Sequence, residues 1–509
     1  MSLRVPARPA ALPSDRTLLR RFAEQAFSRT AGAPLVDGNR VRVLRDATEN
    51  YPAWEAAIGE ARRSVHIEMY IFHRDRVGRR FVELLTAKAR AGVSVRLVYD
   101  WFGCGTGPAL GLFAPLVAAG GQVRAFNPPS ITSALGWLRR NHRKMIVVDG
   151  RTAFIAGLCI GAAWEGRPER GLEPWRDTGL EVTGPVVAHA EQSFDESWRL
   201  AGGPPEPAHH AGPPADACGD VHLRLIATEP FTANMLRLDL LVAALAQQSL
   251  WIADAYFIGT GPYLESLKRA ASDGVDVRLL LPQDSDVGWT VPVSRSLYRP
   301  LLEAGVRIFE WQGTMIHAKT AVADGRWARV GSTNLNLNSW MGNWEMDVAI
   351  EDPRVARTLK DHYEEDLERS TEIVLQTFSQ PWIERRRAQR GRRRGRRQSR
   401  RVVRAVTGVG RSIGAAISGN RPLEEFELGP ITSVGLVLAA IAAVGFFAPR
   451  VLAWPAALIA GWTALTFFAE AWAVRKRRSQ LLKTDSAPAP APVLDASGGP
   501  AKKQVGHDR

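Results

Sequence analysis

One short pattern occurs twice in this chain and constrains both its fold and its chemistry. Residues 142–149 and 317–324 each spell His-x-Lys-x4-Asp, and a glycine follows each copy. The chain holds 9 Lys among its 66 basic residues, so it normally uses arginine, yet both copies carry lysine. A single match to this pattern by chance is uncommon, and a second chance match at the corresponding position of a longer repeat is far less frequent. Two histidines and two lysines brought together would form a phosphoryl-transfer site that needs no metal ion.

The repeat extends well beyond the motif. Residues 64–72 match 249–257, residues 91–97 match 273–279, and His142 then matches His317. Apolar runs at 64–72, 93–99 and 275–281 are typical of strands, and the spacing of Leu, Val and Ala predicts helices over 79–91 and 262–272. Strands alternating with helices indicate an α/β fold. A period of about 180 residues indicates two duplicated domains rather than a solenoid.

The basic charge lies almost entirely at the C-terminal end. Residues 381–509 hold 23 Lys+Arg and 8 Asp+Glu, which leaves 43 basic and 44 acidic residues in 1–380. A neutral body argues against a nucleic-acid-binding protein with a broad basic face. Cys104, Cys159 and Cys218 form no CxxC pair, so we expect no disulfide framework and no zinc site. The early residues contain no apolar run typical of a cleaved signal peptide.

The C-terminal region predicts a membrane anchor. Residues 384–411 contain 13 Arg, whereas 428–448 and 451–469 contain no charged residue. Each uncharged stretch is about the ~20 residues that a helix needs to cross a bilayer. We expect a two-helix transmembrane hairpin; buried core helices and a re-entrant hairpin are the alternatives. Basic flanks on both outer sides place the body in the cytoplasm.

The arginine-rich segment beside this hairpin predicts contact with anionic lipid headgroups. A solvated or nucleic-acid-binding tract is the alternative.

The predicted organisation of the chain is a first half at 1–200 with the motif at 142–149, a linker at 201–219, a second half at 220–383 with the motif at 317–324, an Arg-rich juxtamembrane segment at 384–427, a transmembrane helix pair at 428–474, and a basic then disordered tail at 475–509.

Each motif is interpreted as a strand that enters a tight hairpin. Asp149 and Asp324 are each followed by glycine, and Asp-Gly is a strong two-residue turn signal. His and Lys two residues apart share one face of a strand, whereas the Asp faces the other way. We therefore include Asp149 and Asp324 in the catalytic motif but expect them to be structural, holding the turn or ordering a histidine.

The remaining residues of the motifs match the needs of phosphodiester cleavage. One histidine attacks phosphorus and the other protonates the leaving oxygen, while Lys144 and Lys319 hold the nonbridging oxygens. This chemistry passes through a phosphohistidine and requires no cofactor and no metal. The flanks add Ser332, Asn334 and Glu345 after the second motif, and Gly157 after the first. Small residues let the backbone approach a phosphate, Ser332 and Asn334 can donate to oxygens, and Glu345 can orient a histidine.

These residues resemble the phospholipase D superfamily and, within it, the bacterial cardiolipin synthases. The resemblance covers about residues 40–375. It implies two pseudo-symmetric α/β/α sandwich halves, the phospholipase D fold, with both motifs meeting at the interface between the halves. It also implies that His142 is the nucleophile and His317 the acid. The sequence pieces that carry it are the paired motifs, 67–72, 139–141 before His142, 175–178 with 184–185, and 331–334.

The chain departs from the superfamily pattern at several positions. Cys159 stands where relatives often carry Asn, which predicts that a phosphate hydrogen bond is weakened there. We expect Cys159 to be a packed small residue rather than a nucleophile. Asn336 and Asn338 replace residues that are usually Asp and Arg, which predicts an altered acceptor pocket. The membrane pair lies at the C-terminal end, whereas familiar relatives often carry it at the N-terminal end.

Three functions are compatible with these patterns. The first is a phosphatidyltransferase at the bacterial inner membrane that passes a phosphatidyl group to phosphatidylglycerol or another alcohol. The second is hydrolysis by the same site, as a phospholipase D or a phosphodiesterase or nuclease. The third is a non-catalytic membrane scaffold, against which the intact His and Lys pairs argue. The expected partners are phospholipids and the membrane, with no nucleic acid; the sequence leaves the oligomeric state open.

Overall fold

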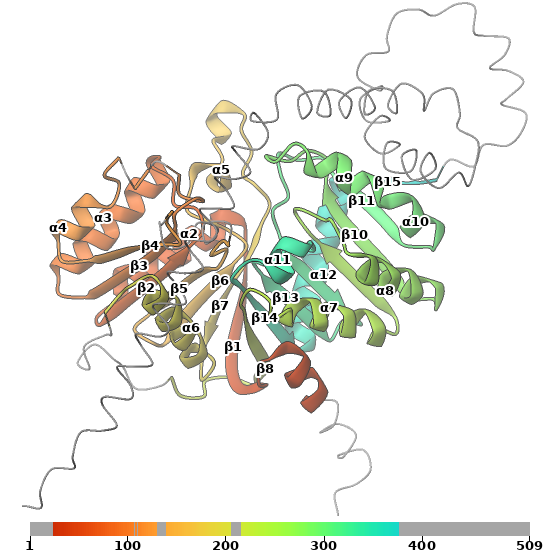
Figure 1. Ribbon diagram of the computed structural model, residues 1–509, viewed down its shortest axis with the longest axis horizontal. Helices are drawn as coiled ribbons and strands as arrows, with labels where there is room; N and C mark the ends of the chain where they lie inside the picture. Colours follow the sequence, from red (N-terminus) through yellow and green to blue (C-terminus); the bar gives the residue numbers. More distant parts are fainter. Residues whose placement is uncertain (1–23, 106, 109, 130–138, 205–214, 376–509) are drawn as a thin grey trace, which may run out of the picture. The chain divides into compact units, whose positions relative to one another are not determined.

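The computed structural model describes residues 24–105, 107–108, 110–129, 139–204 and 215–375 (Figure 1). The first half of this region contains the strands β1 (Val36–Arg45), β2 (Ser64–Met69), β3 (Ser94–Asp100), β4 (Gln122–Phe126), β5 (Lys144–Val148), β6 (Thr152–Ala156) and β7 (Thr178–Thr183). The second half contains β8 (Val221–Thr228), β9 (Ser249–Ala253), β10 (Asp276–Pro282), β11 (Arg307–Trp311), β12 (Thr320–Ala323), β13 (Trp327–Gly331), β14 (Glu345–Glu351) and β15 (Ser370–Ile373).

All fifteen strands belong to one hydrogen-bonded sheet whose order is β15-β11-β10-β9-β12-β13-β14-β8-β1-β7-β6-β5-β2-β3-β4. Apart from β15, the strand order is equivalent from either end: β11 corresponds to β4, β10 to β3, and so on inward to β8 and β1. The halves join where β1 pairs with β8. In each half three neighbouring strands are parallel and the following strands are antiparallel, so the sheet is mixed. The duplication seen in the sequence therefore appears as a duplicated strand order.

Helices connect the parallel strands and cover both faces of the sheet. They are α2 (Asp46–Glu60), α3 (Arg76–Arg90), α4 (Ala114–Ala118), α5 (Ala162–Glu165), α6 (Val187–Leu200), α7 (Asn234–Leu245), α8 (Gly261–Ser272), α9 (Thr290–Ser296), α10 (Tyr298–Glu303), α11 (Leu337–Met341) and α12 (Pro353–Glu368). Helix α3 shows how the sequence specifies them. Asp75 caps its first turn by accepting from the N–H groups of Val77 and Gly78, and Phe81 lies on its buried face.

The described buried apolar residues form four clusters: one in each half, a third between the halves, and a smaller one around Trp251, Phe309 and Tyr363. In the first half, α2, α3, α4 and α5 pack against β2 and β3, and in the second half α7, α8 and α10 pack against β9 and β10. The third core joins inward-facing residues of β5, β6 and β7 to those of β13 and β14, together with α6 and α12. Each half is thus a helix–sheet–helix arrangement, and the inner core binds the two halves to each other.

The predicted α/β class and the predicted strand and helix segments are confirmed: β3 spans Ser94–Asp100, β10 spans Asp276–Pro282, and α3 and α8 cover the two expected helices. One detail differs. His142 and His317 lie just before their strands, which begin at Lys144 and Thr320. The predicted hairpin at 428–474 and the Arg-rich segment at 384–427 lie outside the described residues. Within the described part of the chain, no helix combines the length and apolarity needed to span a bilayer.

Candidate active site

Each motif ends in a turn that its aspartate shapes. Asp149 and Gly150 have φ values of 54° and 64°, and the N–H of Arg151 closes the turn onto the carbonyl of Val148. Asp324 and Gly325 repeat this with φ values of 51° and 60°. Positive φ at both central residues suits Asp-Gly and matches the twist of the flanking strands.

The two aspartate side chains bind backbone at the far end of the neighbouring strand. Asp149 accepts hydrogen bonds from the N–H groups that begin β2, at Arg62, Arg63 and Ser64. Asp324 accepts from those that begin β9, at Gln247, Gln248 and Ser249. Neither aspartate contacts a histidine, so in this geometry they hold the strands that carry the site.

Two short backbone bridges bring the halves together at the histidines. Asn141 pairs in parallel with Trp344, and Ile316 pairs in parallel with Arg176. The N–H of His142 donates to the carbonyl of Trp344 at 2.8 Å, and that of His317 donates to the carbonyl of Arg176 at 2.7 Å. His142 therefore lies beside the residue that follows Trp344, and His317 lies beside the residue that follows Arg176.

That following residue is a buried carboxylate in both cases. Nδ1 of His142 lies 2.8 Å from Oε2 of Glu345, and Nδ1 of His317 lies 2.7 Å from Oδ2 of Asp177. Both carboxylates are fully buried. The two His–carboxylate pairs are crossed, because Glu345 belongs to the second half and Asp177 to the first. A carboxylate at Nδ1 selects the tautomer that leaves Nε2 free to react.

The motif lysines are buried beside the histidines. Nζ of Lys144 donates to the carbonyl of His142 at 2.5 Å, and Nζ of Lys319 donates to the carbonyl of His317. Tyr70 lies under Lys144 and packs edge-on against the His142 ring at 4.7 Å. Tyr256 is placed in the same way near Lys319 and His317. The side-chain conformations of both pairs are therefore constrained by packing.

Burial dominates the electrostatics of the site. It lowers the pKa of His142 to about 4 although Glu345 opposes the change. It also lowers the pKa of His317 to about 4, assisted by Lys319 and opposed by Asp177. It lowers the pKa of Lys319 to about 8. At neutral pH both imidazoles are therefore uncharged in the empty site and Lys319 is positive, while burial also lowers the pKa of Lys144.

The same interactions show that the two motifs form one site. The charge of Lys319 lowers the pKa of His142, and the charge of Lys144 lowers the pKa of His317. The charge of Lys144 also lowers the pKa of Lys319. Charges act on one another in this way when they lie close together in a buried region. The arrangement combines two buried lysines with two imidazoles whose Nε2 atoms are left to react, which suits an anionic phosphodiester.

Among the residues proposed to bind phosphate, Ser332 and Glu345 contact each other. The Ser332 hydroxyl donates to Oε2 of Glu345 at 2.6 Å, the oxygen that also faces His142. Asn334 is buried, and its Oδ1 has no hydrogen-bond partner in the structure. It remains our candidate for a direct substrate contact, which its amide NH2 group would make by donating to a phosphate oxygen.

Gly157 stands at the position of the first half that corresponds to Ser332. A Cβ atom at Gly157 would lie 2.1 Å from Oδ1 of Asp177. The missing side chain makes room for the carboxylate that binds His317. The equivalent space in the second half is filled by the Ser332 hydroxyl on Glu345. The two halves thus reach the same His–carboxylate pairing with different residues.

Sequence reasoning did not assign a role to Asp177, although it precedes a strand in the first half as Glu345 begins one in the second. That shared position is the signal that could have identified it. Cys159 is fully buried, and burial raises the pKa of its thiol although Lys144 and Lys319 lie close enough to oppose that change. The neutral thiol occupies space beside both lysines, where Asn334 stands in the second half.

The duplicated mixed sheet and the crossed His–carboxylate pairs define a phosphodiester-processing enzyme of the phospholipase D type. A family described as "Cardiolipin synthase, PLD-like domain" matches residues 55–198 and 242–367. The chain belongs to this family.

Individual relatives agree with that assignment. The probable cardiolipin synthase YwiE of Bacillus subtilis is 31% identical over 343 residues, covering 66% of this chain and 67% of the relative. The cardiolipin synthase of Listeria innocua is 30% identical over 361 residues, covering 69% of this chain and 74% of the relative. The crystal structure of a phosphatidylserine synthase from Haemophilus influenzae is similar in fold, with a TM-score of 0.56 at 11% identity over 72% of this chain and 97% of that one.

Proposed function

We propose that this protein is a phosphatidyltransferase of the cardiolipin synthase type. It moves a phosphatidyl group from phosphatidylglycerol, or a similar phospholipid, to a hydroxyl of a second phosphatidylglycerol. The observation that carries this proposal is the pair of crossed His–carboxylate contacts beside two buried lysines. The family membership selects the lipid reaction from the phosphodiester chemistries that this site permits.

In the first step His142 attacks phosphorus through Nε2. Its low pKa keeps the ring uncharged, and Glu345 accepts a hydrogen bond from Nδ1–H so that the lone pair lies on Nε2. The bond between phosphorus and the oxygen of the headgroup glycerol breaks, and that glycerol leaves with a proton from His317. The product is a phosphatidyl–histidine on His142.

His317 must carry a proton to act as the acid, although its pKa is about 4 in the empty site. A bound phosphodiester adds a negative charge between the lysines and offsets their effect on the ring. Asp177 stabilises the imidazolium through Nδ1. Substrate binding is thereby coupled to proton uptake by His317, and the proton is present only when there is a leaving group to receive it.

In the second step the hydroxyl of the acceptor loses its proton to His317 and attacks phosphorus, and His142 leaves. Lys144 and Lys319 stabilise the nonbridging oxygens in both steps. Water in place of the lipid alcohol would give phosphatidic acid. Hydrolysis by the same site is therefore the alternative function.

Incubation of the purified full chain with labelled phosphatidylglycerol tests the proposal. Cardiolipin and free glycerol are the expected products, whereas phosphatidic acid alone would support the hydrolase. His142→Asn and His317→Asn should each abolish turnover. Full activity in either variant would reject the two-histidine mechanism. Acid-labile label on the wild-type chain, absent from His142→Asn, would identify the nucleophile.

The membrane location is also a proposal, supported by the sequence of the C-terminal region. Residues 428–474 would anchor the protein as a helix pair in the bacterial inner membrane, residues 384–427 would contact anionic lipids, and the two halves at 1–200 and 220–383 would lie on the cytoplasmic side. Fractionation of cells that express the full chain or a chain ending at residue 383 tests this. Equal membrane association of the two would refute the anchor.

A further inference from the structure

The exposed aromatic side chains of the body gather at one edge of the sheet. Among the described residues, the exposed Trp and Phe side chains are Trp101, Phe102, Phe231 and Trp289, with exposed fractions of 38%, 56%, 67% and 64%. The described Trp and Phe residues elsewhere are buried or half-buried. Large exposed aromatic side chains are unfavourable in water and commonly mark a binding surface.

The strand registers place these side chains at the edge where the motifs begin. Trp101 and Phe102 follow β3, whose end lies beside the end of β2 and thus beside Lys144 at the start of β5. Trp289 follows β10, which reaches Thr320 through β9 in the same way. Phe231 follows β8, whose last residue, Thr228, pairs with Glu345. Loops from both halves therefore bring aromatic rings to the mouth of one site.

Direct contacts connect these rings to residues next to the histidines. The guanidinium of Arg140, two residues before His142, lies 5.3 Å from the Phe102 ring, and that of Arg139 lies 5.1 Å from the Phe231 ring. On the other side, Asp286 in the loop that carries Trp289 accepts a hydrogen bond from the Tyr256 hydroxyl at 2.8 Å. The aromatic residues thus surround the path to the buried nitrogens.

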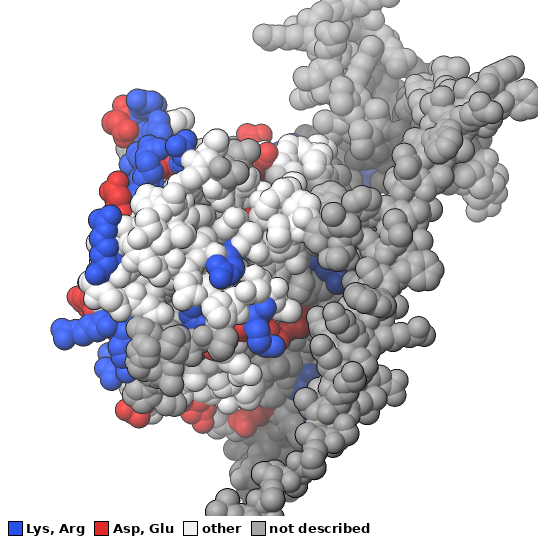
Figure 2. All heavy atoms as spheres, turned by 60° about the vertical axis from the view of Figure 1, so that its left-hand side comes forward, with Lys and Arg blue, Asp and Glu red and all other residues white. Residues whose placement is uncertain are grey.

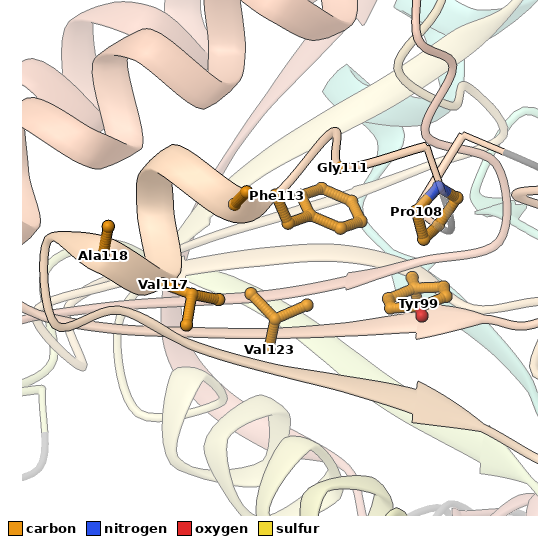
Figure 3. Close-up of a pocket in the computed structure, with 8 residues that line it drawn as sticks. Tyr99, Pro108, Gly111, Phe113, Val117, Ala118 and Val123 are labelled. Atoms are coloured by element: carbon orange, nitrogen blue, oxygen red, sulfur yellow. The ribbon is translucent and has the colours of Figure 1, made fainter.

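Exposed leucines and an apolar cavity extend this surface. Leu110, Leu172 and Leu337 are more than half exposed; Leu110 follows β3 in the same loop as Trp101 and Phe102, Leu172 precedes β7, and Leu337 begins α11. Beside Leu110, a cavity of about 470 Å³ opens between β3, β4 and α4. Its lining is more apolar than polar, and Figure 3 shows the side chains of Tyr99, Pro108 and Val123 around it. On the side of the molecule that carries α3 and α4, Figure 2 shows a broad area in which most side chains are uncharged, with a few Lys and Arg among them.

We propose that the apolar rim, defined as Trp101, Phe102, Leu110, Leu172, Phe231, Trp289 and Leu337, inserts into the surface of a phospholipid bilayer and positions the catalytic mouth against the headgroups. The inference rests on the proposed function, because a diacyl phospholipid substrate is held in a bilayer and its phosphate must reach histidines that are almost fully buried. Trp and Phe are the side chains that favour the bilayer interface, and the exposed Arg139 beside Phe231 suits anionic headgroups.

Depth-dependent quenching in the full-length protein tests this inference without any turnover. Cys104 and Cys159 are buried, so Cys218→Ser removes the exposed thiol. Phe231→Cys and Trp289→Cys then each carry an environment-sensitive fluorophore. Leu245→Cys is the matched control, because Leu245 is also exposed but lies next to the strand end that Asp324 binds, at the opposite edge.

The protein is reconstituted into phosphatidylglycerol bilayers with brominated acyl chains. The rim probes should emit at shorter wavelength and be quenched severalfold more than the probe at 245. Equal quenching at all three positions would overturn the inference, as would no quenching at the rim, which is the result expected if the rim instead binds another protein. Quenched rim probes in an enzyme that makes no cardiolipin would refute the proposed function alone.

A second arm measures turnover. Leu110→Ser, Phe231→Ser and Trp289→Ser combined should lower kcat/KM on bilayer phosphatidylglycerol by about tenfold or more. The same variant should retain wild-type kcat/KM on short-chain phosphatidylglycerol dissolved as monomers, and Leu245→Ser should change neither. An equal loss on both substrates would assign the rim to the integrity of the site and reject membrane insertion.

Discussion

At the scale of single residues, the site depends on side chains that never touch the substrate in the proposed mechanism. Glu345 and Asp177 each bind Nδ1 of a histidine from the other half, and Ser332 binds Glu345. Burial lowers the histidine pKa values, and each carboxylate moderates that effect. The reactive state of each imidazole is therefore specified by a neighbour far away in sequence.

Glu345→Gln should lower kcat by roughly 10²- to 10⁴-fold. The amide cannot stabilise the charge that develops on His142, and it weakens the preference for the reactive tautomer. Steady-state cardiolipin synthesis by the purified protein measures this. Glu351→Gln, a change of the same chemistry at the other end of β14, should leave kcat unchanged. Comparable losses in the two variants would show that the effect is structural.

The low pKa of Lys319 predicts a pH limit. Burial lowers it to about 8, so the side chain loses its positive charge as the pH rises past that value. We expect kcat/KM, which reports the free enzyme, to fall in this range because an uncharged amine no longer stabilises the phosphate. Lys319→Arg, if active, should lack this decrease, because arginine stays charged. A profile that is flat between pH 7 and 10 would contradict the prediction.

At the scale of elements, the motif combines two functions in one hairpin. Its first residues supply the proposed chemistry, and its aspartate, at the opposite end of the strand, binds the start of the neighbouring strand. Asp149 accepts three backbone hydrogen bonds from the beginning of β2, and those bonds outweigh burial and lower its pKa. β2 in turn carries Tyr70 to His142. Because the two copies of the motif share the same spacing, each one connects its histidine and lysine to the start of the neighbouring strand.

Asp149→Asn should destabilise the folded protein by about 1 to 3 kcal/mol while kcat of the folded fraction stays close to wild type. Asn tolerates the positive φ of this position, so the loss reports the charged hydrogen bonds. Since the folded pKa is lowered, this stabilisation is present above the unfolded pKa of about 4 and is lost as the pH falls through the folded value. Denaturant unfolding at pH 7 and at pH 3 should therefore show a smaller difference at pH 3. An abolished kcat would contradict a structural role.

At the scale of the whole molecule, the two halves complete each other. The inner core packs β6 and β7 against β13 and β14, and the bridges at the histidines cross the same boundary. Each half contains a His and a Lys but lacks the carboxylate for its own histidine. The repeat is therefore a single catalytic unit rather than two independent sites.

Neither half should be active by itself. Chains of residues 1–200 or 220–383 expressed separately would each lack a carboxylate for their histidine and would expose the inner apolar core. Co-expression should restore measurable transfer if the halves associate, and the assay is cardiolipin formation in detergent with phosphatidylglycerol. Activity in one half alone would disprove the crossed arrangement, unless two copies of that half assemble, which size-exclusion chromatography would reveal.

The sequence by itself determined the elements and led to a prediction of the reactive groups. The apolar runs predicted β3 and β10, and the Asp-Gly signals predicted the turns after the motifs, because these features depend on neighbours within a few residues. The paired motifs pointed to His142, Lys144, His317 and Lys319 because two rare matches in register are hard to explain otherwise. Family resemblance added the expected fold and the lipid chemistry.

Only the tertiary structure decided which groups meet. The pairing of His142 with Glu345 and of His317 with Asp177 spans more than a hundred residues and follows from two backbone bridges across the inner core. It also separated Ser332, which binds Glu345, from Asn334, whose side-chain oxygen is left unpaired. Local spacing specifies which face of its strand a side chain points to. The electrostatic environment and the hydrogen-bond partners of that side chain depend on the distant strands that pack beside it.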